Sequence, residues 1–249
     1  MEDGRVLVWI SAWTILYKVL VKRGGLSPWR AHVWISFVHA LLVSLCSLPH
    51  AVSISCFADP ETLLFHPPPM PWLLDAALGY YTFDTIRALD LLMKSPMRTS
   101  PSSTMSLGDR AVWASESSPL LVPTTFPFSL TLSISLSAVV MSNLYRNAAF
   151  ALLAEELSTV FLRAVQILPS RHPIQLCCAL LFLVFFIVMR VVVGLVLISR
   201  SFEVMAFFSW ATVGERTIHF YLGLMLLVSR LVHFLWLMAM LLALGQGQG

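Results

Sequence analysis

The chain is a succession of long apolar runs separated by short segments that contain charged residues or proline. A helix that crosses a lipid bilayer needs about 20 predominantly apolar residues, so these runs predict about seven crossings, within a range of about six to eight. The first, second and fourth runs are short for a full span. The predicted crossings are Val6–Val21, Val33–Leu48, Trp72–Met93, Leu130–Leu144, Ala148–Leu168, Ile174–Ser199 and Ile218–Leu244.

Composition supports a membrane protein, because 58% of the residues are apolar and only 12% are charged. A soluble domain carries about 25% charged residues. The fold class expected is therefore all-α, a polytopic transmembrane helix bundle that forms a single domain over residues 1–249. The first run lacks the basic start and small-residue cleavage site of a secretory signal, and we expect it to be retained as a crossing.

The basic residues between crossings predict how the bundle is oriented. With seven crossings, the basic residues of the first, third and fifth loops fall on one side, which the positive-inside rule assigns to the cytoplasm. The N-terminus would then lie outside or in a lumen, although Arg200 and Arg216 in the sixth loop oppose this pattern. The supporting residues are Lys22, Arg23, Arg30, Lys94, Arg98, Arg110 and Arg171.

Charged residues within the predicted crossings are the candidates for function. A charge at the middle of a bilayer costs about 2.5 to 3.5 kcal/mol on insertion scales, so each should face the bundle interior and have a partner. Asp84 and Arg87 are three residues apart and are predicted to pair, either as a site for a lipid headgroup or as a packing pair. Arg190 needs an acidic partner from another helix, and Asp84 and Glu156 are the candidates.

Histidines within the crossings are the other candidates. Arg230 and His233 share a helix face with Trp236 and could form an acid/base pair or a packed polar cluster. His39 is expected to be a hydrogen-bonded structural residue, with a ligand-binding or catalytic role as the alternative. No metal site is predicted, because only His32, seven residues earlier, accompanies it.

Several function classes are not supported by the sequence. The net charge is +3, from 16 basic and 13 acidic residues that are scattered along the chain, whereas nucleic-acid binding needs a concentrated basic surface. No soluble-enzyme or cofactor motif is present, and no cofactor is expected. The four cysteines are interpreted as small buried hydrophobes, not as disulfides or zinc ligands.

Four segments together resemble the TLC domain, in particular the small TLC-domain proteins outside the ceramide synthases. They are WRAHVWISFVHALLVS (Trp29–Ser44), LGYYTFDTIRALDLL (Leu78–Leu92), AEELSTVF (Ala154–Phe161) and VMRVVVG (Val188–Gly194). With the apolar helices between them they cover most of the chain, and their order and spacing carry the resemblance.

The resemblance implies a helix bundle whose polar interior handles membrane lipid, with a role in lipid homeostasis, binding or sensing. Residues at the family's marked positions are His39, Asp84, Glu156, Ser158 and Arg190. Membrane lipids are the partners expected, and protein partners are not specified. The endoplasmic reticulum or another endomembrane is expected by analogy, with the plasma membrane as the alternative. Together with Arg87, Arg230 and His233, the marked residues form the candidate site.

One departure from the family bears on catalysis. Relatives usually carry a His-His pair at the start of the helix that begins here near Leu130, and ceramide synthases use it in their active-site motif. In this chain the place reads Phe128-Ser129-Leu130-Thr131. An enzyme is therefore less favoured, and an acyl-CoA-dependent N-acyltransferase of ceramide-synthase type is the alternative. A transporter or seven-helix receptor is the second alternative.

The missing pair coincides with the end of a segment that is unlike the rest of the chain. Residues Ser95–Ser129 are rich in Ser, Thr and Pro and have no apolar periodicity, so we expect a disordered loop. Our hypothesis is that this segment is an insertion, either genuine or an error of the gene model such as a retained intron.

Transcript sequencing tests the insertion hypothesis. If the segment is an artefact, messages that lack it and restore a continuous third crossing should predominate. Messages that all encode residues Ser95–Ser129, with no shorter form, would show that the insertion is genuine.

Overall fold

A computed structural model describes residues 4–52, 68–94, 136, 149–150, 152–168, 172–193, 195–196, 199 and 213–245. Within these residues all regular structure is helical, as the sequence predicts. The predicted crossing Leu130–Leu144 lies outside the described residues except for Leu136, and the Ser/Pro-rich segment Ser95–Ser129 lies outside them entirely.

Each of the other six predicted segments contains helical structure, although Ala148–Leu168 holds only the short η1 and the 12-residue α9. The elements are α1 (Gly4–Lys22), α2 (Pro28–Val52), α5 (Pro71–Lys94), η1 (Leu153–Glu155), α9 (Glu156–Ile167), α10 (Pro173–Phe185), η2 (Phe186–Val193) and α12 (Val213–Gly245). Here η1 is a 3-10 turn that runs into α9, and η2 is a π-helix that continues α10. The second crossing is longer than predicted, because α2 continues through Pro49 instead of ending before it.

Proline and glycine set several of the helix boundaries. Pro28, Pro71 and Pro173 each occupy the first position of a helix, where the missing N–H of proline has no helical partner to lose. His172 caps α10, because its Nδ1 accepts a hydrogen bond of 3.3 Å from the N–H of Ile174. Between α1 and α2 the chain turns at Gly25, whose φ of 61° is readily adopted only by glycine.

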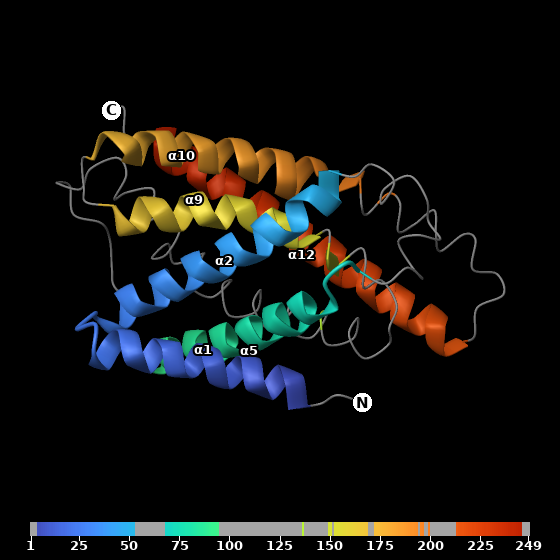
Figure 1. The fold of residues 1–249 in the computed structure, drawn as a ribbon. Helices are drawn as coiled ribbons and strands as arrows, with labels where there is room; N and C mark the ends of the chain where they lie inside the picture. The colour runs from blue at the N-terminus through green and yellow to red at the C-terminus, as the bar shows by residue number, and fades with distance from the viewer. Residues whose placement is uncertain are drawn as a thin grey trace.

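The helices form two groups on either side of α2 (Figure 1). Helices α1 and α5 lie together on one side, and α9 and α10 lie on the other, while α12 passes behind the second group. The C-terminal ends of α1, α5 and α9 and the N-terminal ends of α2 and α10 gather at the left of the view. Lys22, Arg23 and Arg30 belong to this end, which we call the basic end.

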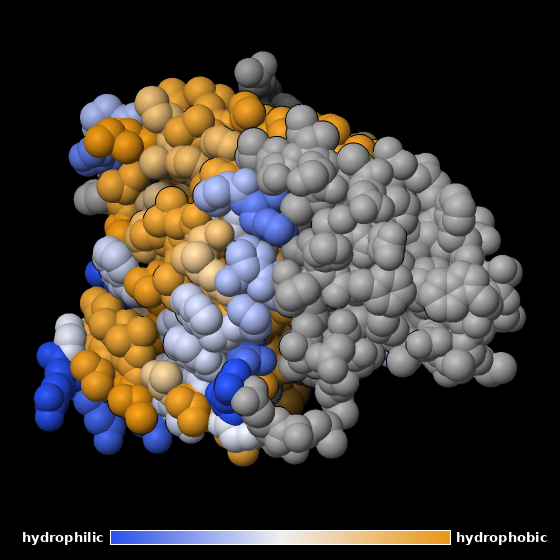
Figure 2. Space-filling model, turned by 45° about the vertical axis from the view of Figure 1, so that its right-hand side comes forward, coloured by the Kyte–Doolittle hydropathy of each residue, from blue (hydrophilic) through white to orange (hydrophobic). Residues whose placement is uncertain are grey.

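Three helical stretches among the described residues are long and apolar enough to cross a membrane: Gly4–Lys22, Arg30–Ala51 and Pro173–Val193. The last of these combines α10 with η2. Helix α5 contains Asp75, Asp84, Arg87 and Asp90 and is not among them. Figure 2 shows hydrophobic residues over much of the face in view, with hydrophilic residues at its lower edge and a paler band of intermediate hydropathy. The described part therefore has the surface of a membrane protein.

Helices α1 and α5 pack closely at a glycine. A Cβ atom added to Gly79 would lie 2.6 Å from the Cβ atom of Trp9 and 3.1 Å from the backbone nitrogen of Ile10. Trp13 is the one buried residue of α1, and its indole N–H donates a long hydrogen bond of 3.4 Å to the carbonyl of Ala76. Further along α1, the partly buried Leu16 and Tyr17 also pack against the core, and the ring of Tyr17 lies 6.0 Å from that of Phe83.

The glycine contact yields a matched pair of substitutions. Gly79→Ala is expected to destabilise the protein by about 1 to 3 kcal/mol, because overpacking forces the two helices apart. Gly223→Ala in α12 meets nothing within 4 Å and should be neutral or slightly stabilising. Thermal unfolding of the protein in detergent micelles measures both. An unchanged midpoint for Gly79→Ala would show that α1 does not pack at this position.

Candidate functional site

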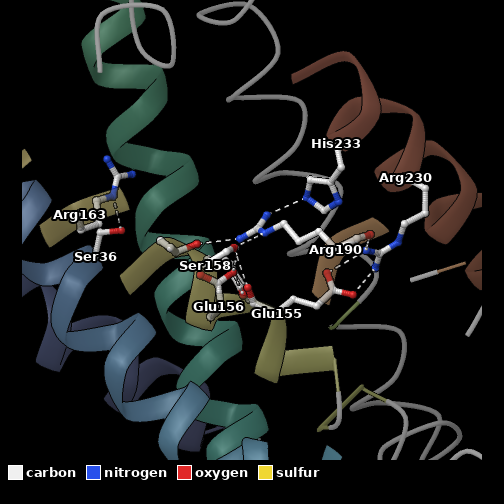
Figure 3. A network of polar contacts seen from close by, with 10 residues as sticks. Ser36, Glu155, Glu156, Ser158, Arg163, Arg190, Arg230 and His233 are labelled. Carbon is white, nitrogen blue, oxygen red and sulfur yellow. Dashed lines mark hydrogen bonds and ion pairs between the residues drawn. The ribbon is translucent and has the colours of Figure 1, made fainter. Parts of the chain in front are cut away.

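A buried arginine on η2 lies at the centre of the candidate site. Arg190 is 5% exposed and donates from Nε to the Ser158 hydroxyl at 2.8 Å and from Nη2 to the Thr159 hydroxyl at 2.7 Å. Its Nη2 also lies 3.6 Å from Oε1 of Glu156, so Glu156 is the partner present of the two predicted for Arg190. Its Nη1 lies 2.7 Å from Nε2 of His233 (Figure 3). The guanidinium therefore joins α9 to α12.

A second arginine reaches the same place from α12. Arg230 forms an ion pair with Glu155, with 2.7 Å between Nη2 and Oε1, and both side chains are 9% exposed. Its Nη1 donates to Oε2 of Glu155 at 2.9 Å and to the backbone carbonyl of Arg190 at 2.7 Å. Four elements (η1, α9, η2 and α12) thus contribute to one network of two arginines and two glutamates. We call it the arginine network, and its residues are Glu155, Glu156, Ser158, Thr159, Arg190, Arg230 and His233.

The π-helical form of η2 helps to place the network. A π-helix shifts backbone hydrogen bonds from i→i+4 to i→i+5, and such turns occur frequently at functional sites. Arg190 lies within this stretch, beside the buried Phe186 and Met189. Its carbonyl accepts a bond from Arg230 of another helix, an uncommon role for a carbonyl within a helix. The bond from Arg230 to this carbonyl therefore ties α12 to the π-helical turn that carries Arg190.

Glu156 connects the network to α5. The hydroxyl of Tyr81 donates to its Oε1 at 3.0 Å. The ring of Tyr81 in turn meets the ring of His39 edge-on, with 5.5 Å between their centroids. The structure therefore brings together five of the candidate residues: Glu156, Ser158, Arg190, Arg230 and His233. Tyr81 contacts both this group and His39.

His39 is fully buried in an aromatic cage. Its ring stacks on Tyr80 at a centroid distance of 3.7 Å and an interplanar angle of 12°, and Trp13 meets it edge-on at 5.7 Å. Its exposure is 0%, and neither ring nitrogen has a hydrogen-bond partner among the described residues. The expected hydrogen bond of His39 is therefore absent among the described residues.

The predicted pairing of Asp84 with Arg87 is also wrong. Asp84 lies 3.3 Å from Nε2 of His32 on α2, and Arg87 pairs with Asp90 at 2.8 Å. Arg87 also donates to the hydroxyl of Tyr17 on α1 and lies over its ring. The reason is helix rotation, because Asp84 faces α2 whereas Arg87 faces α1.

Sequence reasoning did not single out several residues that complete these contacts. Four of them are uncharged, so the criterion of a charge within a crossing does not identify them: Thr159, Tyr81 and the cage residues Trp13 and Tyr80. Arg163, which donates to the Ser36 hydroxyl at 3.0 Å, lies within the predicted crossing Ala148–Leu168, so its charge was a signal that could have identified it (Figure 3). Within the described residues no group of three or more His, Cys, Asp or Glu side chains could hold a metal ion.

Comparison of the chain with models of known protein families, with curated proteins and with solved structures finds no match. The resemblance to the TLC domain accordingly stays a prediction from the four sequence segments. The candidate site must be interpreted from its own geometry.

The ion pair between Arg230 and Glu155 can be tested by a double-mutant cycle. Arg230→Met or Glu155→Leu alone should cost about 3 to 5 kcal/mol, because each leaves a buried charge without its partner. The double variant should cost much less than the sum, since no buried charge remains. Unfolding in micelles gives the coupling energy.

The more exposed pair Arg87–Asp90 is the control for this cycle, with side chains that are 20% and 24% exposed. Its coupling should be about 1 kcal/mol or less, as in other solvent-accessible pairs. Equal coupling in the two cycles would contradict the assignment of Arg230 and Glu155 to a buried network.

Proposed function

We propose that this chain is a multi-pass membrane protein of the TLC-domain type that binds membrane lipid through its polar interior and acts in membrane lipid homeostasis. The observation that carries the proposal is the arginine network within helices that are otherwise apolar. Helix packing alone does not require such a network, because a buried ion pair is often no more stable than apolar residues of similar volume. Ionisable residues within membrane segments are typically retained for function.

The position of Arg190 along its helix supports contact with a lipid headgroup. The apolar stretch begins at Pro173, and 17 residues at about 1.5 Å each place Arg190 about 26 Å from that start. The hydrocarbon core of a bilayer is about 30 Å thick. If Pro173 lies at one membrane boundary, Arg190 lies close to the other, where headgroups and acyl carbonyls are found.

The surroundings of the network also suit a lipid. Val188 and Val192 on η2 are 45% and 52% exposed, and Leu231 and Phe234 on α12 are 56% and 53% exposed. These apolar side chains neighbour Arg190, Arg230 and His233 on the same two helices. The helices that carry the network therefore also present apolar side chains to the acyl chains of the bilayer. A headgroup drawn toward the arginines would keep its chains on this apolar face.

The proposal includes the finer topology. It comprises seven crossings, an N-terminus outside or in a lumen, and a location in the endoplasmic reticulum or another endomembrane. The gathering of Lys22, Arg23 and Arg30 at the basic end supports this orientation. The N-acyltransferase alternative depends on the family resemblance alone, and no described contact favours it or a transporter. The arginine network supports the lipid-binding function.

Native mass spectrometry of the full chain, purified from membranes in detergent, tests the proposal. The wild type should retain lipid, and Arg190→Lys should lower lipid occupancy at least about threefold, because lysine keeps the charge but lacks the guanidinium fork. Arg87→Lys, which alters an arginine of α5 outside the network, should retain lipid as the wild type does.

The same preparation provides the outcomes that count against the proposal. A wild type that carries no lipid, or equal occupancy in both variants, would contradict it. Formation of an N-acyl product from acyl-CoA and a sphingoid base would establish the enzyme alternative instead. A thermal unfolding measurement on each variant separates loss of lipid from loss of the fold.

A further inference from the structure

His39 is the one buried histidine in the described residues whose two ring nitrogens both lack a hydrogen-bond partner. An unsatisfied buried polar group costs about 1 to 3 kcal/mol, so a phenylalanine at this position would be expected if packing were the only requirement. The imidazole is held by its aromatic neighbours Trp13, Tyr80 and Tyr81, and not by polar ones. The structure therefore contains one oriented donor and one acceptor with no use inside the described part of the fold.

The depth of His39 restricts what could use these atoms. It is 11 residues from the start of α2 at Pro28, which corresponds to about 16 Å at about 1.5 Å per residue. This is near the middle of a hydrocarbon core about 30 Å thick. A phosphate at this depth would place its charge near the bilayer centre, where the free-energy cost of a charge is greatest. A neutral hydroxyl avoids that cost and needs only hydrogen-bond partners.

The chemistry of the cage agrees with this restriction. A neutral imidazole offers one N–H donor and one acceptor, which matches a hydroxyl that also donates and accepts. No charged side chain bonds His39 directly. The neighbouring Tyr81 is hydrogen-bonded to the carboxylate of Glu156, and this nearby negative charge disfavours an anionic ligand. The arginine network, in contrast, presents guanidinium groups suited to a charged or carbonyl-bearing headgroup. The two sites therefore differ in depth and in ligand class.

We propose that His39 and its cage of Trp13, Tyr80 and Tyr81 bind a neutral lipid with a free hydroxyl, such as a diacylglycerol, through a hydrogen bond to the imidazole. This inference rests on the proposed lipid-binding function and specifies the class of lipid. Helix α1 is the route of access. Trp13 is its one buried residue and covers His39, so displacement of α1 would expose the imidazole to the bilayer. This displacement would also separate the partly buried Trp9 and Tyr17 from the core against which they pack.

The test uses three lipids that share oleoyl chains and differ in one group. Dioleoylglycerol has a free hydroxyl, trioleoylglycerol has that hydroxyl esterified, and dioleoylphosphatidic acid has it phosphorylated. Binding to the full chain in micelles is measured by native mass spectrometry and by the shift in the unfolding midpoint. The wild type should bind dioleoylglycerol more tightly than trioleoylglycerol.

Three histidine variants assign the effect. His39→Phe should weaken dioleoylglycerol binding about five- to tenfold, as loss of one hydrogen bond predicts. The same variant without lipid should unfold at or above the wild-type midpoint, because it removes an unsatisfied group. His39→Gln, which keeps a donor and an acceptor, should recover part of the binding. His50→Phe on the same helix, where His50 packs edge-on against Phe150, should bind as the wild type does.

Several outcomes would overturn the inference. Dioleoylglycerol binding that is unchanged in His39→Phe, or phosphatidic acid binding that depends equally on His39, would exclude a site for a neutral hydroxyl. A lipid-free His39→Phe that unfolds well below the wild type would show a structural role, such as a bond to a buried water. If phosphatidic acid binds through Arg190 and dioleoylglycerol does not bind, only this inference fails. If no lipid binds, the proposed function fails with it.

Discussion

The described fold depends on how a guanidinium group is satisfied away from water. Arg190 cannot lose its charge, and in an apolar interior each of its N–H donors needs an acceptor. It finds them on Ser158 and Thr159 of α9 and on His233 of α12, and the nearby carboxylate of Glu156 balances its charge. Because a guanidinium is planar and rigid, these bonds fix the distance and rotation of α9, η2 and α12 more tightly than apolar packing alone would.

The same constraint explains why η2 departs from α-helical geometry. The widened turn presents the carbonyl of Arg190 to Arg230, which Glu155 holds in place from the neighbouring element η1. Two arginines then balance two glutamates, so the buried network has no net charge if His233 is neutral. Neutral balance makes the network tolerable in an apolar bundle, but its side chains remain far more specific in position than leucines would be.

The sequence predicted the helices more successfully than the contacts between them. Long apolar runs identify crossings because the bilayer imposes a length. The need of a buried arginine for an acidic partner predicted either Asp84 or Glu156 for Arg190, and Glu156 is the one in contact. The pairing of Asp84 with Arg87 failed because spacing along one helix does not determine how that helix is rotated. Asp84 turned toward His32 of α2 and Arg87 toward Tyr17 of α1. The cage of His39 had no sequence signal, since aromatic residues are common in membrane helices.

The two polar regions differ in how well they are satisfied, and this difference assigns them different parts in lipid binding. The arginine network joins η1, α9, η2 and α12 through the hydrogen bonds and ion pairs of Arg190 and Arg230, so it stabilises one arrangement of these four elements. His39 is unsatisfied and lies beneath α1, which contributes Trp13 as its one buried residue. Local opening occurs where few buried contacts must break. We therefore expect the α9 side of α2 to remain rigid during lipid exchange, while α1 moves to admit a ligand to His39.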